Sequence, residues 1–318
     1  MIKNSPYIWG TDKPYNDYAS YIKSRFENRL QKISADAGFS CPNRDGEKGR
    51  SGCTYCDNDT FKPFYCSPDK PIKQQLEEGI AFFSEKYKTQ DYLAYFQSFS
   101  NTYDKLGNLK KLYSEALSVK GVKGLVIATR PDCMDEEKLD YFESLARDYY
   151  IVLEYGIESC NDESLKRINR GHDFAESKKA IQMTAGRGID IGAHLILGLP
   201  GESRENMLHH ADLLSELPID MLKLHQLQII KGTRMAREYA KNPEDYNLFT
   251  APEYIEFVAD FLERLHPNMR LERFVSEVPP DKLLAPKWGR LKNFEIVHKI
   301  IRALENRKSF QGRLCKTV

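Results

Sequence analysis

Three cysteines gather in one glycine-rich segment near the start of the chain. Eleven residues separate Cys41 from Cys53, and two residues separate Cys53 from Cys56. Thiolates are soft ligands that select zinc, copper(I) or iron–sulfur clusters. Because glycine accepts positive φ, a chain of this kind can wrap closely around an inorganic group; glycines stand at positions 38, 46, 49 and 52. The segment therefore predicts a metal or cluster site.

A fourth cysteine bears on the kind of site. Nine residues separate Cys56 from Cys66, which is placed to complete a four-thiolate zinc site. The spacing alone leaves a zinc site and an iron–sulfur site both open. Cys133, Cys160 and Cys315 are scattered and lack any paired spacing, so we expect no second cluster.

The overall composition fits an ordinary globular protein. Of 318 residues, 41% are hydrophobic and 11% are aromatic, which is too many aromatic residues for a disordered chain. No apolar run approaches the ~18–20 residues of a membrane helix, and no signal peptide is visible. We therefore expect a cytoplasmic protein without membrane contact, in which seven cysteines do not form a disulfide framework.

Short apolar runs alternate with amphipathic stretches along the middle of the chain. Strands are expected over residues 31–35, 92–98, 124–128, 151–156, 190–197 and 221–227, and helices over 72–87, 106–119, 135–149, 175–187 and 204–217. This alternation predicts a parallel sheet with right-handed crossovers. Six units are too few for a closed eight-fold barrel, and a doubly wound sheet stays open. In a barrel, the cysteine loop after the first strand would lie at the rim where sites are built.

The alternation weakens beyond about residue 235. Helices are expected over 251–265 and 294–306, on either side of a strand over 270–275. The chain thus divides into an N-terminal extension (1–30), a core (31–235) and a C-terminal extension (236–318). Its near-neutral total hides an asymmetry, because residues 282–318 hold ten Lys and Arg against two Glu, a net charge of +8 within a total of +1.

The cysteine loop resembles the cluster loop of radical S-adenosylmethionine (SAM) enzymes. Residues 36–46 read DAGFSCPNRDG, and residues 52–56 read GCTYC. More narrowly, they are similar to the YhcC/MnmL-type branch, which is related to the radical domain of the catalytic subunit of Elongator. The resemblance continues in the family's order through segments 95–97, 101–103, 129–133, 168–172, 195–202, 223–225, 231–233 and 311–312. It therefore covers nearly the whole chain.

This resemblance implies an α/β fold, a partial (β/α)6 TIM-like barrel with a C-terminal extension. It implies a [4Fe–4S] cluster on Cys41, Cys53 and Cys56, with one iron open for the amino and carboxylate groups of SAM, so that Cys66 is not a ligand. One-electron reduction of SAM would yield a 5′-deoxyadenosyl radical that abstracts a substrate hydrogen. The electron would come from an external donor such as flavodoxin or ferredoxin.

Further cofactor contacts are expected near the strand ends. The resemblance places Tyr55 at the adenine, Asn101 and Thr102 at the methionine amino group, and Glu158 at the ribose. A guanidinium offers a fixed donor fork for the SAM carboxylate, and this role is expected of Arg130. A cofactor-side role is expected of Arg170. Two polar groups on one interior strand face are unusual in a dry core, so contacts with cofactor or substrate are expected of Lys223 and His225.

Each of these positions has a structural alternative. Tyr55 would simply pack in its loop, Asn101 would cap a turn, and Arg130 would pair with Asp132 or another acid at the rim. Segment 170–172 would be a linking turn. Glu154 shares a strand face with Glu158 and is either an interior polar residue or a substrate contact. His194 is expected to be a satisfied core or barrel histidine.

The branch implies an enzyme that modifies the wobble uridine of tRNA, taking 5-carboxymethylaminomethyl-uridine toward 5-aminomethyl-uridine. The basic segment 282–318, with Trp288 and Phe310, is suited to phosphates and unpaired bases; alternatively it is a solvated helix at the barrel bottom. Also open are a radical SAM enzyme on another RNA or a small molecule, and a non-catalytic zinc-containing RNA-binding protein. No catalytic residue stands out, although Cys133 and Cys160 follow strands and are candidates for a redox or hydrogen-donor role.

Overall fold

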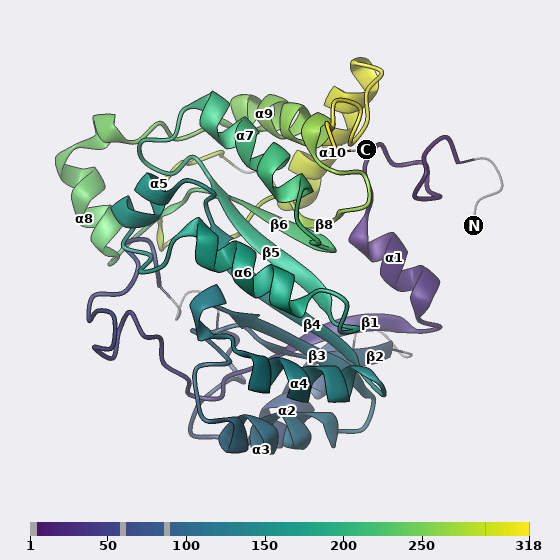
Figure 1. The fold of residues 1–318 in the computed structure, drawn as a ribbon. Helices are drawn as coiled ribbons and strands as arrows, with labels where there is room; N and C mark the ends of the chain where they lie inside the picture. Colours follow the sequence, from purple (N-terminus) through teal and green to yellow (C-terminus); the bar gives the residue numbers. More distant parts are fainter. Residues whose placement is uncertain (1–4, 58–61, 86–89, 290, 318) are drawn as a thin grey trace.

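The molecule is built on a parallel sheet whose strands follow one another in chain order. The computed structural model describes residues 5–57, 62–85, 90–289 and 291–317 (Figure 1). Seven strands pair in the order β1-β2-β3-β4-β5-β6-β8. They are β1 (Arg29–Ala35), β2 (Gln90–Phe96), β3 (Val122–Thr129), β4 (Tyr150–Glu158), β5 (Asp190–Leu197), β6 (Met221–Gln226) and β8 (Arg270–Arg273). All six strands expected over residues 31–227 are present.

The sheet curls into a half-barrel. β1 and β8 are its opposite edges, yet the Lys32 Nζ atom of β1 lies 2.5 Å from Glu272 Oε1 of β8. Helix α1 (Tyr18–Arg25) contacts both edge strands, and Asp17 forms a β-bridge with Leu271. The partial TIM-like barrel predicted from the sequence is confirmed, and α1 covers its lower opening.

The seventh strand corrects the expected count of six. β8 was expected as part of a C-terminal extension, but it pairs in parallel with β6 and lies in the same sheet. β8 is only four residues long, and helix α8 (Arg234–Lys241) precedes helix α9 (Ala251–Arg264) in the connection. The periodic signal is therefore weak there. The exact division into extensions and core stays a prediction.

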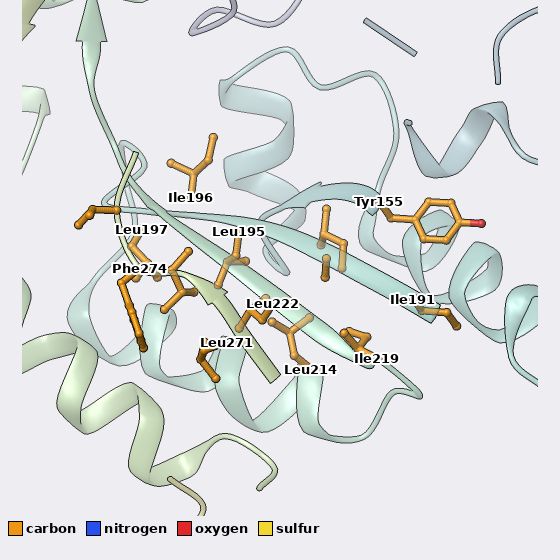
Figure 2. Packing of buried hydrophobic residues seen from close by; sticks show 14 of the residues in the cluster. Tyr155, Ile191, Leu195, Ile196, Leu197, Leu214, Ile219, Leu222, Leu271 and Phe274 are labelled. Carbon is orange, nitrogen blue, oxygen red and sulfur yellow. The ribbon is translucent and has the colours of Figure 1, made fainter. Parts of the chain in front are cut away.

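Helices cover the outer face of the half-barrel. They include α2 (Ile72–Ser84), α3 (Leu106–Leu117), α4 (Glu136–Ala146), α6 (Phe174–Thr184), α7 (Arg204–Ser215) and α9 (Figure 1). Alternate residues of each strand face them. Figure 2 shows Leu195, Leu222 and Leu271 from β5, β6 and β8 in one buried cluster with Leu214 of α7. The other face carries the polar residues of these strands into the interior.

The C-terminal segment packs outside the half-barrel. Helix α10 (Asn293–Asn306) contacts α9 and so packs against a helix of the outer layer. Trp288 Nε1 donates to the carbonyl of Phe249, and Arg307 forms ion pairs with Glu256 and Asp260. These two residues, expected to meet RNA, are therefore engaged within the chain.

Shorter elements complete the rim. Helix α5 (Asp162–Arg167) follows β4, and β7 (Ile229–Ile230) pairs antiparallel with β9 (Leu283–Ala285). Among the described residues, no helix is long and apolar enough to cross a membrane.

Gln311 joins distant segments at the seam between the edge strands. Its Oε1 accepts from the amide of Asn16, and its Nε2 donates to the carbonyls of His266 and Met269. The side chain is fully buried. Three backbone polar groups in this region thus depend on one amide side chain.

We expect Gln311→Ala to lower the free energy of unfolding by about 3 kcal/mol, because it leaves buried backbone groups unsatisfied. Gln74→Ala is the matched control, since this exposed glutamine only pairs with Glu78 on the surface, and it should change stability by less than about 0.5 kcal/mol. Urea unfolding of both variants measures the difference. Equal losses would contradict the role given to Gln311.

Candidate functional site

A cavity of about 220 Å³ opens where the strands end at their carboxyl termini. It is lined by residues that follow β2, β3, β4, β5 and β6 and by the cysteine loop. Eight of the predicted site residues line it: Cys41, Cys53, Tyr55, Cys56, Arg130, Glu158, Arg170 and His225. Asn101, Thr102 and Lys223 do not.

The cysteine loop is fixed by a buried asparagine that sequence reasoning did not single out. Asn43 Nδ2 donates to the carbonyls of Asn169, at 2.5 Å, and Arg170, and it lies 3.7 Å from Cys53 Sγ. Gly171 permits this approach, because a Cβ there would come within 2.9 Å of Asn43 Oδ1. The loop is therefore clamped onto the turn after α5.

Cationic side chains surround the thiols. Arg170 Nη1 lies 3.7 Å from Cys53 Sγ, and Arg44 Nη2 donates to the carbonyl of Cys56. Burial and the neighbouring Cys53 raise the pKa of Cys56 to about 11, although Arg44 acts in the opposite direction. Positive charge beside thiolates favours a ligand set that carries net negative charge.

The donor set fits a cluster better than a zinc ion. No three His, Cys, Asp or Glu side chains of the described chain form a group able to hold one metal ion. Cys66 lies away from the cavity, where its Sγ is 3.2 Å from the carbonyl of Ser34 and burial raises its pKa to about 12. Cluster cysteines each bind a different iron, so three thiols around one cavity suffice.

Arg130 pairs with Asp132, as the structural alternative expected, and one of its guanidinium nitrogens has no partner in the described structure. Its Nε and Nη2 atoms donate to the two carboxylate oxygens of Asp132, each at 2.8 Å. Its Nη1 atom is buried with no hydrogen-bond partner in the described structure, although the residue lines the cavity. An unsatisfied guanidinium N–H beside a cavity suits an anionic ligand group.

Arg170 and Glu158 meet beside β4. Arg170 Nη2 donates to the carbonyl of Gly156 at 2.5 Å and lies 3.7 Å from Glu158 Oε1. Glu158 itself has φ of +69°, an uncommon conformation for a residue with a side chain. This conformation ends β4 and leaves the carboxylate lining the cavity.

Asn101 and Thr102 have structural contacts instead. Asn101 Nδ2 donates to the carbonyls of Phe96 and Ala128, and Thr102 Oγ1 lies 2.6 Å from Thr129 Oγ1. These bonds hold the turn after β2 against the end of β3, as the turn-capping alternative expected for Asn101. The expected contact with SAM has no support in the geometry, because neither residue reaches the cavity.

The two rim cysteines do not line the cavity either. Burial raises the pKa of Cys133 to about 12 and that of Cys160 well above the ordinary thiol range. A thiol held protonated is a poor nucleophile and redox centre. The structure thus gives no support for a redox role of these cysteines.

The cavity floor carries charges on the inner strand faces. Lys223 Nζ lies 2.7 Å from both carboxylate oxygens of Glu154. Glu154 lines the cavity, whereas Lys223 does not. His194 is a hydrogen-bonded histidine inside the barrel, as one form of the expectation had it: it lines the cavity, and its Nε2 lies 3.1 Å from Glu154 Oε2. Sequence reasoning missed Lys32, Glu272 and Arg273, which lie on the two edge strands β1 and β8.

Known proteins match this chain over most of its length. A family model described as the radical SAM superfamily matches residues 43–214, and one described as the radical SAM C-terminal domain matches residues 219–306. The chain is 36% identical over 318 residues to the uncharacterized protein MJ0486 of Methanocaldococcus jannaschii, covering 98% of this chain and 95% of that one. It is 33% identical over 277 residues to protein YhcC of Escherichia coli, covering 87% and 88%.

Two further matches concern proteins named for other activities. The tRNA uridine(34) acetyltransferase of Methanocaldococcus infernus is 26% identical over 159 residues, which cover 49% of this chain and 29% of that protein. The solved structure of the Elp3 protein of the same archaeon, with its N-terminus deleted, superposes with a TM-score of 0.66 at 16% identity, over 89% of this chain and 64% of that one. That likeness concerns the fold.

We expect Asp132→Asn to destabilise the protein by about 3 kcal/mol, because it leaves the buried Arg130 without its counter-ion. Burial would raise the pKa of Asp132, but the hydrogen bonds from Arg130 bring it down to about 2. A carboxylate with a lowered folded-state pKa stabilises above its unfolded pKa. The difference between wild type and variant should therefore shrink by about 2 kcal/mol as the pH falls from 4 toward 2.

Urea unfolding of the iron-free protein across this pH range provides the measurement. Asp148→Asn, at an exposed position, is the control and should be nearly neutral at every pH. A difference that stays constant down to pH 2 would show that Asp132 is not held ionised by Arg130.

Proposed function

This chain belongs to the radical SAM superfamily, and on that premise we propose that it modifies the wobble uridine of tRNA, taking 5-carboxymethylaminomethyl-uridine toward 5-aminomethyl-uridine. Enzymes of this superfamily use a [4Fe–4S] cluster and SAM, which together supply one-electron chemistry that removes a hydrogen from the substrate. The observation that carries the proposal is the match to a tRNA uridine(34) acetyltransferase over half of this chain, since position 34 is the wobble position. The conversion would remove a hydrogen atom and then one electron from the carboxymethyl carbon, with the external electron carrier as acceptor; water would then cleave the bond from this carbon to the side-chain amine nitrogen and release the two-carbon group as glyoxylate.

Three thiols and five other side chains would hold the cofactors. In this proposal Cys41, Cys53 and Cys56 bind three irons, and Asn43 and Arg170 donate toward the sulfur of Cys53. The cofactor contacts are assigned to the side chains that line the same cavity: the unpartnered Arg130 Nη1 for the SAM carboxylate, Glu158 for the ribose hydroxyls, and Tyr55 for the adenine. His225 faces the cavity at its floor and is left to the substrate.

The proposed partner is tRNA, with an external one-electron donor such as flavodoxin or ferredoxin. Several cations of segment 282–318 pair with acids of the chain, among them Arg313 with Glu263 and Lys316 with Asp212. Lys299 and Arg302 are exposed on α10 and form no ion pair within the described residues, so they are the better candidates for phosphate contact.

Loss of the gene should leave 5-carboxymethylaminomethyl-uridine in tRNA and deplete 5-aminomethyl-uridine and any nucleoside made from it. Mass spectrometry of tRNA nucleosides from a deletion strain measures this. Complementation with the wild-type chain should restore the pattern, whereas a Cys53→Ala chain should not. An unchanged nucleoside profile in the deletion strain would refute the tRNA proposal and favour a radical SAM reaction on another substrate.

Replacing any one of Cys41, Cys53 and Cys56 by Ala should abolish binding of about four irons per chain after anaerobic reconstitution, because each thiolate would bind its own iron. Cys66→Ala is the matched control and should keep the iron and the brown colour. Iron, sulfide and zinc analysis reads the result. Stoichiometric zinc in place of iron, or iron loss in Cys66→Ala, would favour the zinc-containing RNA-binding alternative.

A further inference from the structure

Five charged side chains form a cluster on the inner face of the half-barrel, here called the floor cluster. It consists of Lys32, Glu154, Lys223, Glu272 and Arg273, which come from β1, β4, β6 and β8. Glu154 and Arg273 line the cavity, and the other three lie beneath or beside them. The cluster therefore forms the end of the cavity that faces the barrel interior.

Two lysines neutralise the two carboxylates of the floor cluster. Lys223 Nζ is 2.7 Å from both oxygens of Glu154 and 3.4 Å from Glu272 Oε1. Lys32 Nζ is 3.0 Å from Glu154 Oε1 and 2.5 Å from Glu272 Oε1. Burial would raise the pKa of Glu154, but Lys223 and Lys32 bring it well below its usual range. Both carboxylates are thus ionised and already paired.

Arg273 is the third cation, and it has no carboxylate of its own. No ion pair or side-chain hydrogen bond joins it to another described residue, yet it lines the cavity within electrostatic reach of Lys223 and His225. The floor cluster therefore carries one unbalanced positive charge. Arg273 is half-buried, so its guanidinium is partly withdrawn from water without a carboxylate beside it among the described residues. An anionic ligand group at this point would supply the missing counter-charge.

The histidines on the floor do not supply the missing negative charge. Burial, with Arg273 and His194 beside it, holds the pKa of His225 well below its usual range, so the ring is neutral. Its Nε2 atom is buried without a partner. His194 must place its Nε2 hydrogen toward Glu154, because the carboxylate only accepts. The neutral His225 is left as a second polar group beside Arg273.

We propose that Arg273 binds a carboxylate of the substrate at the cavity floor, and that this carboxylate is the carboxymethyl group of the modified uridine. A guanidinium pairs with a carboxylate through two parallel hydrogen bonds, which selects this anion by shape as well as charge. The identity of the carboxylate rests on the proposed function. Arg130, which lies within electrostatic reach of Cys41, is the separate cation available to SAM.

This assignment gives the enzyme a way to tell substrate from product. 5-Carboxymethylaminomethyl-uridine carries the carboxylate, and 5-aminomethyl-uridine carries only an amine. Loss of the carboxymethyl group would remove the partner of Arg273 and return the floor cluster to its unbalanced state. The product should therefore bind more weakly than the substrate, because only the substrate has a carboxylate that can pair with Arg273.

The test compares two synthetic anticodon stem-loops that differ only at the wobble position, one with 5-carboxymethylaminomethyl-uridine and one with 5-aminomethyl-uridine. Fluorescence anisotropy under anaerobic conditions measures their affinities for the reconstituted enzyme. We expect wild type to bind the first at least ~10-fold more tightly, because an ion pair that is shielded from water contributes an affinity gain of at least this size. Arg273→Gln should bring this ratio close to one, and Arg273→Lys should keep part of it.

Arg147→Gln, at an exposed position after α4, is the matched control and should leave the ratio unchanged. The melting temperature of Arg273→Gln should not fall, because the variant loses no ion pair. A variant that unfolds would contradict the unpaired state of Arg273. If wild type converts the modified tRNA but Arg273→Gln keeps the full ratio, the subsite is wrong and the function stands. If wild type neither binds nor converts modified tRNA, both proposals fail.

Discussion

The ion pairs around Glu154 set the shape and the chemistry of this protein together. Glu154 lies in the central strand β4, and Lys223 and Lys32 reach it from β6 and from the edge strand β1. Lys32 continues the chain of contacts to Glu272 on the opposite edge. A buried charge is unfavourable unless it is paired with an opposite charge. The sheet can therefore hold these side chains in its interior only because it curls enough to bring them into contact. The same curling creates the cavity above them.

The cysteine loop depends on the half-barrel in turn. The loop contains no helix or strand among its described residues; Asn43 and Arg170 approach the sulfur of Cys53, and Asn43 connects the loop with the turn after α5. Arg170 also donates to the carbonyl of Gly156 in β4, two residues beyond Glu154. A rigid support of this kind matters for a site that must hold two cofactors and a substrate in one small space.

The sequence alone predicted the parts of the fold that carry a strong periodic signal. The strands over 190–197 and 221–227 alternate clearly, so β5 and β6 were placed nearly to the residue. β8 was recognised as a strand, but four residues give no information about which sheet they join. Thr102 was assigned to SAM from the family resemblance, and Lys223 was assigned to the cofactor or the substrate from its polarity. A sequence does not show which buried polar groups already satisfy each other. Arg273 went unnoticed for the same reason, since its lack of a partner is visible only in three dimensions.

The seam between β1 and β8 has a consequence for biosynthesis. Gln311 ties residue 16 to residues 266 and 269, so the edges of the half-barrel acquire their final contacts only from a residue translated near the end of the described chain. All three cluster cysteines leave the ribosome long before that point. The growing chain therefore exposes the complete cysteine loop before the contacts made by Gln311 have formed.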